Sequence, residues 1–146
     1  MILDELHTYI NAQAGLETLS IYKPDLEDGD GAPDFQLALR PTGGLPPVRT
    51  LDDTVGSIVD PIAIQHLMRS RPVGHAGNVA SAYQDAWATL WLVYEAVDLI
   101  MVKRRTLTGV IYEYAEILQP PAPLSLADEK DRWLFSFNAI YHRERT

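Results

Sequence analysis

Cysteine is missing from all 146 residues of the sequence, which excludes disulfide bonds and metal sites built from thiolates. Also missing is any uninterrupted apolar run of the roughly 18 residues that a membrane-spanning helix requires. The first residues, MILDELHTYI, are acidic and amphipathic, whereas a secretory signal has basic residues followed by an apolar block. We therefore expect a cytoplasmic chain without membrane contact.

Positive charge is scarce. The 12 lysines and arginines are outnumbered by 20 aspartates and glutamates, and the formal net charge is −8. Proteins bind nucleic acid largely by neutralising its phosphates with cationic side chains. The composition therefore argues against specific DNA binding. An acidic surface could still line a passage through which DNA slides without sticking.

The length and the 47% hydrophobic content suffice for one core, and we expect a single domain over residues 1–146. The predicted elements are a helix at 2–14, strands at 18–23, 35–40 and 61–71, a helix at 79–102, and strands at 110–118 and 133–142. The order α-β-β-β-α-β-β does not alternate one by one. It predicts an α+β fold, with a mostly antiparallel sheet of about five strands and two helices packed on one face.

The clearest strand pattern lies at the end of the chain. One side carries Trp133, Phe135, Phe137, Ala139 and Tyr141, and the other carries Ser136, Asn138 and His142. Such period-two alternation indicates a strand with one buried face. The end of the chain is therefore expected to be built into the sheet.

Two other segments indicate additional contacts. Trp91, Leu92 and Leu99 fall partly outside the apolar stripe of the helix at 79–102, so either the core wraps around this helix or a second partner packs on it. Residues 41–61 are rich in proline and glycine and predict a long loop, which is uncommon inside a compact domain and often makes contacts.

An acidic segment, PDLEDGDGAPD at residues 24–34, separates two predicted strands and indicates a hairpin with an acidic loop. Its first four carboxylates are Asp25, Glu27, Asp28 and Asp30. An EF-hand is excluded, because aligning Gly31 with the invariant glycine places Leu26 and Leu37 where Asp and Glu are required. A solvated hairpin tip is expected; a loop lining an acidic passage and an irregular cation site are the alternatives.

The sequence contains no catalytic motif of the nucleophile-elbow or phosphate-loop type. The histidines are His7, His66, His75 and His142, and we expect them to be polar surface residues because they lack metal-ligand spacing. Asp128, Glu129 and Asp131 alternate with Lys130 and Arg132, which indicates loop ion pairs and turn caps. We therefore expect no enzyme, no metal and no cofactor.

Motifs over nearly the whole chain resemble a known family. LDELHTYINAQAGL is a helix ending near a glycine, IYKP lies in a short strand, and PDFQLALRPTGG is similar to an extended strand followed by Pro and Gly. PIAIQHLMRSRP is similar to an apolar strand ending in Arg-x-Arg, and AYQDAWATLWLVYEAV to a helix begun by tyrosine. PAPLSLADEKDRWLFSFNAIYHRER is similar to a Pro-x-x-Leu-x-x-Asp-x-x-x-Arg segment before an alternating strand with Asn.

In this order the six motifs resemble the tail terminator family of long-tailed bacteriophages, with its related minor capsid and neck completion proteins. The long segment 41–61 and Ala127, where the family often has Gly, depart from the pattern.

The resemblance implies the same fold and a structural role. Copies of the chain would form a hexameric ring at the head-proximal end of the tail tube, stop tube polymerisation and join the tail to the head or neck. The implied location is the virion tail or neck, after assembly in the host cytoplasm. The implied partners are other copies of the chain, the tail tube protein and a head completion or neck protein, with DNA passing through the bore.

On this basis the acidic loop residues Asp25, Glu27, Asp28 and Asp30 are expected near the bore. The residues expected near subunit contacts are Arg69, Arg71, Trp91, Asp128, Asp131 and Arg132. Two other interpretations stay open. One is a head completion, neck or minor capsid protein of similar fold. The other is a small α+β enzyme or ligand-binding domain, which would have a deep pocket with convergent polar groups.

Overall fold

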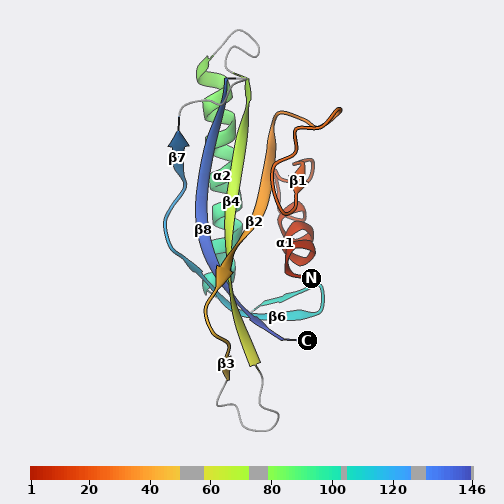
Figure 1. Ribbon diagram of the computed structural model, residues 1–146, viewed down its shortest axis with the longest axis vertical. Helices are drawn as coiled ribbons and strands as arrows, with labels where there is room; N and C mark the ends of the chain where they lie inside the picture. The colour runs from red at the N-terminus through yellow and green to blue at the C-terminus, as the bar shows by residue number, and fades with distance from the viewer. Residues whose placement is uncertain (50–57, 73–78, 103–104, 126–130, 146) are drawn as a thin grey trace.

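The computed structural model describes residues 1–49, 58–72, 79–102, 105–125 and 131–145, which form an α+β fold (Figure 1). The helices are α1 (Ile2–Asn11) and α2 (Val79–Val102). The strands are β1 (Ile21–Tyr22), β2 (Gln36–Gly44), β3 (Val48–Arg49), β4 (Ile58–Pro72), β5 (Arg105–Leu107), β6 (Val110–Ile117), β7 (Ala122–Ser125) and β8 (Arg132–Glu144). Among these residues no helix is long and apolar enough to cross a membrane.

The strands form one curled sheet in the order β1-β2-β4-β8-β6-β5, with β3 also paired to β4 and β7 to β8 (Figure 1). β1 runs parallel to β2, and the other described pairs are antiparallel. The centre is the ladder of β4 and β8, which extends from Val59 opposite Glu144 to Pro72 opposite Arg132. These strands lie along the long axis of the molecule, with α2 behind them.

The predicted terminal strand is confirmed, since this segment becomes the central strand β8, but the expectation of a single buried face is wrong, because Ser136 and His142 on the opposite side are buried as well. Phe135, Phe137, Ala139 and Tyr141 are fully buried on its core side. Burying a large apolar side chain contributes about 2–3 kcal/mol. In addition, β8 is hydrogen-bonded along both edges, to β4 on one side and to β6 and β7 on the other. These interactions hold the end of the chain in place.

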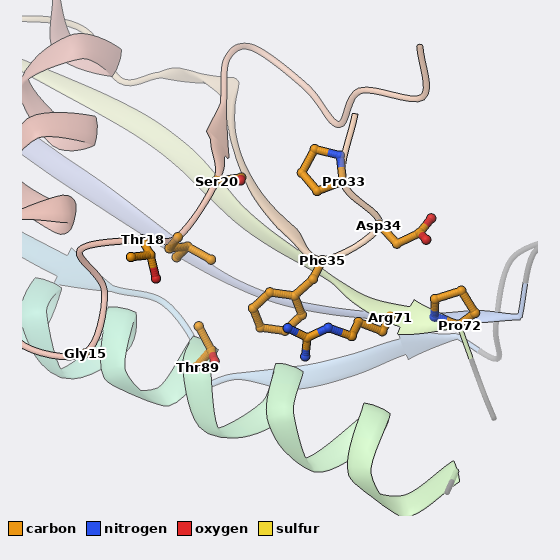
Figure 2. Close-up of a pocket in the computed structure, with 10 residues that line it drawn as sticks. Gly15, Thr18, Ser20, Pro33, Asp34, Phe35, Arg71, Pro72 and Thr89 are labelled. Atoms are coloured by element: carbon orange, nitrogen blue, oxygen red, sulfur yellow. The ribbon is translucent and has the colours of Figure 1, made fainter. Parts of the chain in front are cut away.

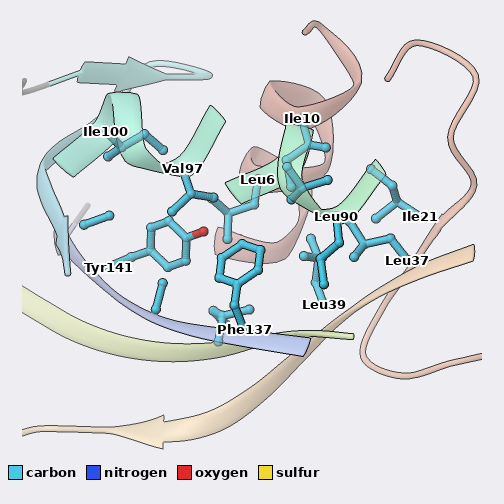
Figure 3. Packing of buried hydrophobic residues seen from close by; sticks show 14 of the residues in the cluster. Leu6, Ile10, Ile21, Leu37, Leu39, Leu90, Val97, Ile100, Phe137 and Tyr141 are labelled. Atoms are coloured by element: carbon cyan, nitrogen blue, oxygen red, sulfur yellow. The ribbon is translucent and has the colours of Figure 1, made fainter. Parts of the chain in front are cut away.

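The core lies between the helices and the sheet (Figure 3). The predicted helix at 79–102 is confirmed, and it buries Leu90, Val93, Val97 and Ile100 completely. Figure 3 shows side chains of α1 and α2 reaching the same cluster as those of β2 and β8. The spacing of three and four residues along α2 is what places these side chains on one face.

A buried ion pair fixes α1 to the C-terminal strand. Glu5 of α1 is 4% exposed and accepts hydrogen bonds from Nη2 and Nε of Arg143 at 2.6 and 2.8 Å, and one from the hydroxyl of Tyr112. Burial acts to raise the pKa of Glu5, but the bonds from Arg143 and Tyr112 outweigh it and lower the pKa. The hydroxyl of Tyr9 donates to the carbonyl of Ala96 at 2.6 Å, which joins α1 to α2.

The α+β class and the two helices are as expected, but the predicted sheet is wrong in its details. Among the described residues it has eight strands rather than about five. It is mostly antiparallel as expected but includes the parallel pair β1–β2, and it is curled, so it is not a simple layer with two helices on one face. The segment 41–61 contains the end of β2, all of β3 and the start of β4, while 50–57 lie outside the described residues. The strands that were not predicted, β3, β5 and β7, have only two to four residues each, too few to show alternation.

The predicted hairpin at the acidic loop is also wrong. Ile21 lies opposite Leu37 and Tyr22 opposite Ala38 in parallel register. Parallel strands need a connection that returns to the starting end, and residues 24–34 provide it. A true hairpin occurs elsewhere, where Thr108 and Gly109, both with positive φ, connect β5 to β6 in the two-residue turn that suits twisted strands.

Two histidines that were predicted at the surface are buried. His66 of β4 is fully buried and stacks on Phe137 with 4.1 Å between ring centroids. The hydroxyl of Tyr141 lies 2.7 Å from its Nε2. His142 is 8% exposed and stacks on Tyr114 at 3.9 Å. His7 is half-buried, and His75 lies outside the described residues. Aromatic side chains on neighbouring strands cover both buried imidazole rings. The sequence around each histidine does not indicate these partners.

Replacing His66 should change the acid sensitivity of the fold. Burial lowers the pKa of His66 from 6.5 to about 3, so the unfolded chain takes up a proton that the folded chain does not. Its contribution to stability is complete above pH 6.5 and is lost as pH falls toward 3, at up to about 1.4 kcal/mol per pH unit. His66→Gln does not titrate and its amide can still bond Tyr141. Urea unfolding between pH 7.5 and 4.5 should show a shallower decline for His66→Gln; parallel curves would contradict this assignment.

Candidate functional site

The acidic loop, residues 24–34, is anchored to the end of β4 and the start of β8. Gln36, fully buried at the start of β2, holds the loop backbone through its side chain. Its Nε2 donates to the carbonyls of Glu27 at 3.0 Å and Pro33 at 2.6 Å, and its Oε1 accepts from the amide of Glu27 at 2.7 Å. The loop is therefore a fixed feature of the surface rather than a free tip.

Two arginines complete this anchoring. Arg69 of β4 donates from Nε to the carbonyl of Asp34 at 2.9 Å and from Nη2 to the carbonyls of Glu27 and Pro33 at 3.0 and 3.1 Å. Its Nη1 donates to Oδ1 of Asp28 at 2.7 Å. This one side chain binds three backbone carbonyls and one carboxylate of the same loop.

Arg132, at the start of β8, binds the same carboxylate. Its Nη2 donates to Oδ1 of Asp28 at 3.0 Å and its Nη1 to Oδ1 of Asp34 at 2.9 Å. We refer to Arg69, Arg132, Asp28 and Asp34 as the arginine cluster. Its four members come from β4, β8 and the acidic loop, and two cations face two carboxylates.

The burial of the arginine cluster is uneven. The side chains of Arg69 and Arg132 are 2% and 4% exposed, whereas those of Asp28 and Asp34 are 63% and 45% exposed. A buried guanidinium needs nearby negative charge, because leaving it unpaired is strongly unfavourable. The hydrogen bond from Arg132, aided by Arg69, lowers the pKa of Asp28. The acidic loop thus supplies the countercharge for cations inside the protein.

A β-bulge separates Arg69 from the nearby Arg71. The register of β4 on β8 shifts between Arg69 and Pro72, and a bulge breaks the alternation of faces. Arg69 therefore contacts the acidic loop, whereas Arg71 lies over the ring of Phe35 at 4.6 Å and pairs with Asp85 of α2 at 2.9 Å. A regular strand would have pointed both arginines to the same face.

A pocket of about 380 Å³ lies on the Arg71 side. Figure 2 shows Arg71 and Phe35 side by side, with Thr89 of α2 across from them and Pro33 and Asp34 on the loop side. Its lining residues are Gly15, Thr18, Leu19, Ser20, Pro33, Asp34, Phe35, Arg71, Pro72 and Thr89. Asp34 lines the pocket and is also a member of the arginine cluster, so the pocket and the cluster are adjacent.

The remaining acidic side chains of the loop have different surroundings. Asp25 pairs with Arg40 at the rim, where both side chains are about half exposed. Burial acts to raise the pKa of Asp25, and hydrogen bonding to Arg40 and to the amide of Leu26 lowers it overall. The carboxylates of Glu27 and Asp30 have no ion-pair partner among the described residues. In the part of the chain that the structure describes, no cluster of His, Asp and Glu could hold a metal ion.

The structure thus brings most of the predicted site residues to one end of the sheet. Arg69 and Arg132, expected at subunit contacts, are satisfied inside the chain, while Arg71 is partly exposed at the pocket. Asp131 is exposed beside the cluster with a left-handed φ of 56°, which aspartate tolerates better than most residues. Trp91 lies apart on α2, packed against Trp87 and Tyr94. Asp128 lies outside the described residues.

Sequence reasoning missed four members of this region: Asp34, Phe35, Gln36 and Asp85. A signal was available only for the cations, since Arg69 interrupts an apolar strand and a charge in such a strand needs a partner. The sequence does not indicate which residue is that partner, because Asp28 lies 41 residues before Arg69 and 104 residues before Arg132. Chemically, the arrangement holds carboxylates in fixed positions.

Comparison with protein-family profiles and with curated protein sequences gives no match. Among solved structures, a chain from the virion of a native gene transfer agent (GTA) particle is similar, with a TM-score of 0.57 and 15% sequence identity. The similarity covers 99% of this chain and 95% of that chain. At this level of identity the two chains share a fold over practically their whole length.

Removing Arg69 should release the acidic loop selectively. In Arg69→Met the loop carbonyls and Asp28 lose their common donor, so amide hydrogen exchange of Glu27 should become about tenfold faster or more. The matched control is Arg40→Met, which removes the rim pair with Asp25 and a hydrogen bond to Gln65 but no contact with the loop carbonyls, and exposed pairs contribute little. Exchange at Phe137 in β8 reports global stability in both variants. Equal exchange at Glu27 in the two variants would contradict the anchoring role.

Proposed function

We propose that this protein is a structural component of a phage-like virion. The observation that carries the proposal is the fold shared with a chain of the gene transfer agent virion, which extends over 99% of this chain. The sequence motifs that resemble phage tail terminators run over the same length, from the α1 segment to β8. The first line of support compares backbone geometry and the second compares local sequence pattern.

In its specific form the proposal is a hexameric ring at the head-proximal end of a tail tube. The ring ends tube polymerisation, contacts the tail tube protein on one side and a head completion or neck protein on the other, and lets DNA pass. The role is structural rather than enzymatic. The finished protein resides in the virion, after assembly in the host cytoplasm.

The distribution of exposed apolar side chains supports a ring. Subunits in a ring meet head to tail, so each needs two different contact surfaces. Leu92 and Leu99 are 40% and 47% exposed on α2, and Tyr114 and Leu118 are 44% and 54% exposed on and just after β6. These groups lie on different elements, as two distinct surfaces require.

The first test is native mass spectrometry over a concentration series, with negative-stain images of the same samples. We expect a six-subunit species with a central hole. Leu99→Glu should weaken subunit association at least about tenfold, because it places a charge in an apolar contact. Leu45→Glu is the matched control, since Leu45 is 59% exposed and lies between β2 and β3.

A chain that stays monomeric at every concentration, alone and with purified tail tubes, would contradict the ring. A ring that binds capsid connectors but not tail tubes would reassign the protein to a head completion, neck or minor capsid role. A monomer that binds a small ligand in the pocket beside Arg71 would favour the enzyme or ligand-binding interpretation.

We also propose that the acidic loop lies near the bore, where negative charge repels passing DNA. Glu27 and Asp30 are the side chains to test, because Asp25 and Asp28 are engaged with arginines of the same chain. Rings of the double variant Glu27→Lys/Asp30→Lys should bind duplex DNA about tenfold more tightly than rings of Asp4→Lys/Glu17→Lys, a matched reversal at exposed positions outside the acidic loop and the proposed contact surfaces. Fluorescence anisotropy at several salt concentrations measures this difference, and equal affinities would remove the loop from the bore.

A further inference from the structure

The acidic loop contains both Asp–Gly pairs of the sequence, Asp28–Gly29 and Asp30–Gly31. In an Asp–Gly pair the side-chain carboxyl group can react with the next backbone nitrogen, because glycine has no Cβ to shield that nitrogen. All four residues are exposed. The two pairs have the same local chemistry, so any difference in their reactivity comes from what the folded chain does to each carboxyl group.

The carboxyl group of Asp28 is held by the sheet. Its Oδ1 accepts hydrogen bonds from Arg69 at 2.7 Å and from Arg132 at 3.0 Å. Both arginine side chains are almost completely buried, so these bonds restrict rotation of the carboxyl group. The bond from Arg132, aided by Arg69, also lowers the pKa of Asp28, which leaves less of its neutral acid form.

The pair Asp30–Gly31 has no such restraint. The carboxyl group of Asp30 makes no hydrogen bond or ion pair with any residue that the structure describes, and the backbone N–H of Gly31 has no acceptor there either. The N–H of Ala32 donates to the carbonyl of Gly29 at 3.0 Å and closes a turn. Gly31 has a φ of 82° in this turn, which glycine adopts at little cost. Neither reacting group of this pair is therefore engaged elsewhere.

We propose that Asp30 is a site of spontaneous backbone modification, where aspartate isomerises to isoaspartate, and that the bonds from Arg69 and Arg132 protect Asp28 from the same reaction. In the first step the amide nitrogen of Gly31 forms a bond to Cγ of the neutral acid. The Cγ–OH bond breaks, and the hydroxyl group leaves with the amide proton as one water molecule. The product is a five-membered succinimide ring.

In the second step one water molecule adds to a carbonyl carbon of the succinimide ring, and the bond from that carbon to the Gly31 nitrogen breaks. Addition at Cγ restores aspartate. Addition at the backbone carbonyl leaves Gly31 attached through the former side chain of Asp30, which is isoaspartate. The two steps release and consume one water molecule, so no oxidant, reductant or other reactant is needed.

The modification changes the shape of the acidic loop and keeps its charge. Isoaspartate adds one methylene group to the main chain at residue 30. The flanking segments are anchored, because the carbonyls of Glu27 and Pro33 are bound by Arg69 and Gln36. The extra length is therefore confined to the tip of the loop. This inference concerns the single chain and does not depend on ring formation.

The test is to incubate the purified full chain at pH 6 and 37 °C over several weeks, beside an identical sample unfolded in guanidinium chloride. Electron-transfer fragmentation of the digested chain measures isoaspartate at residues 28 and 30 separately. In the folded chain we expect isoaspartate to accumulate about tenfold faster at Asp30 than at Asp28, because the carboxyl group of Asp28 is held and less of it is neutral. In the unfolded chain the two rates should be similar.

Three variants make the outcome specific. Asp30→Glu keeps the charge but would have to close a larger ring, so isoaspartate-type linkage at residue 30 should disappear. Arg69→Met removes one bond to Asp28 and should raise isoaspartate at residue 28 several-fold. Arg40→Met is its matched control, since Arg40 pairs with Asp25, and it should leave residue 28 unchanged. Amide exchange at Phe137 verifies that each variant is folded, and the wild-type comparison does not depend on any variant.

The proposal is overturned if isoaspartate accumulates equally at both residues of the folded chain, or if Asp30 does not react in the folded chain while both residues react in guanidinium chloride. The first result would mean that the arginines do not protect Asp28, and the second that the turn holds Asp30 unreactive. Neither result affects the detection of a six-subunit species, so failure of this proposal is distinguishable from failure of the proposed function.

Discussion

The antiparallel ladder between β4 and β8 is the interaction on which the rest of the molecule depends. It pairs β8 with a strand that begins at Ile58, in one register from Val59 to Arg69 and, after a shift, again at Pro72. Its core face carries Phe135, Phe137 and Tyr141, against which α2 packs. Because β8 is paired along both edges, displacing it would expose unpaired backbone groups together with the buried aromatic side chains that it carries.

Charged side chains tie outer segments to both ends of this ladder. Near the end of β8, Arg143 binds Glu5 and fixes α1. At the start of β8, Arg132 joins Arg69 in holding the acidic loop. In both places a chain segment far away in sequence supplies the countercharge for a cation on a central strand. The ladder therefore positions the helix and the loop as well as the core.

This arrangement explains how a chain with net charge −8 can have an ordered acidic surface. Cations of the central strands neutralise Asp28 and Asp34 from inside, and Glu27 and Asp30 remain directed to solvent without an ion-pair partner among the described residues. A rigid scaffold with an anchored acidic loop suits the structural role proposed for a phage-like virion, since DNA in a narrow passage must be repelled rather than held.

The sequence by itself determined the features that depend on local periodicity. The helix Val79–Val102 and the strand Arg132–Glu144 were both predictable, because their apolar spacing repeats over many residues. Only the tertiary structure decided the parallel pairing of β1, the burial of His66 and the arginine cluster. Strand pairs of two residues carry no periodic signal, and the partners of Arg69, Arg132 and Arg143 lie 41, 104 and 138 residues away. Which charges meet is fixed by the register and bulge of β4 on β8, and such long-range geometry leaves no local pattern in the chain.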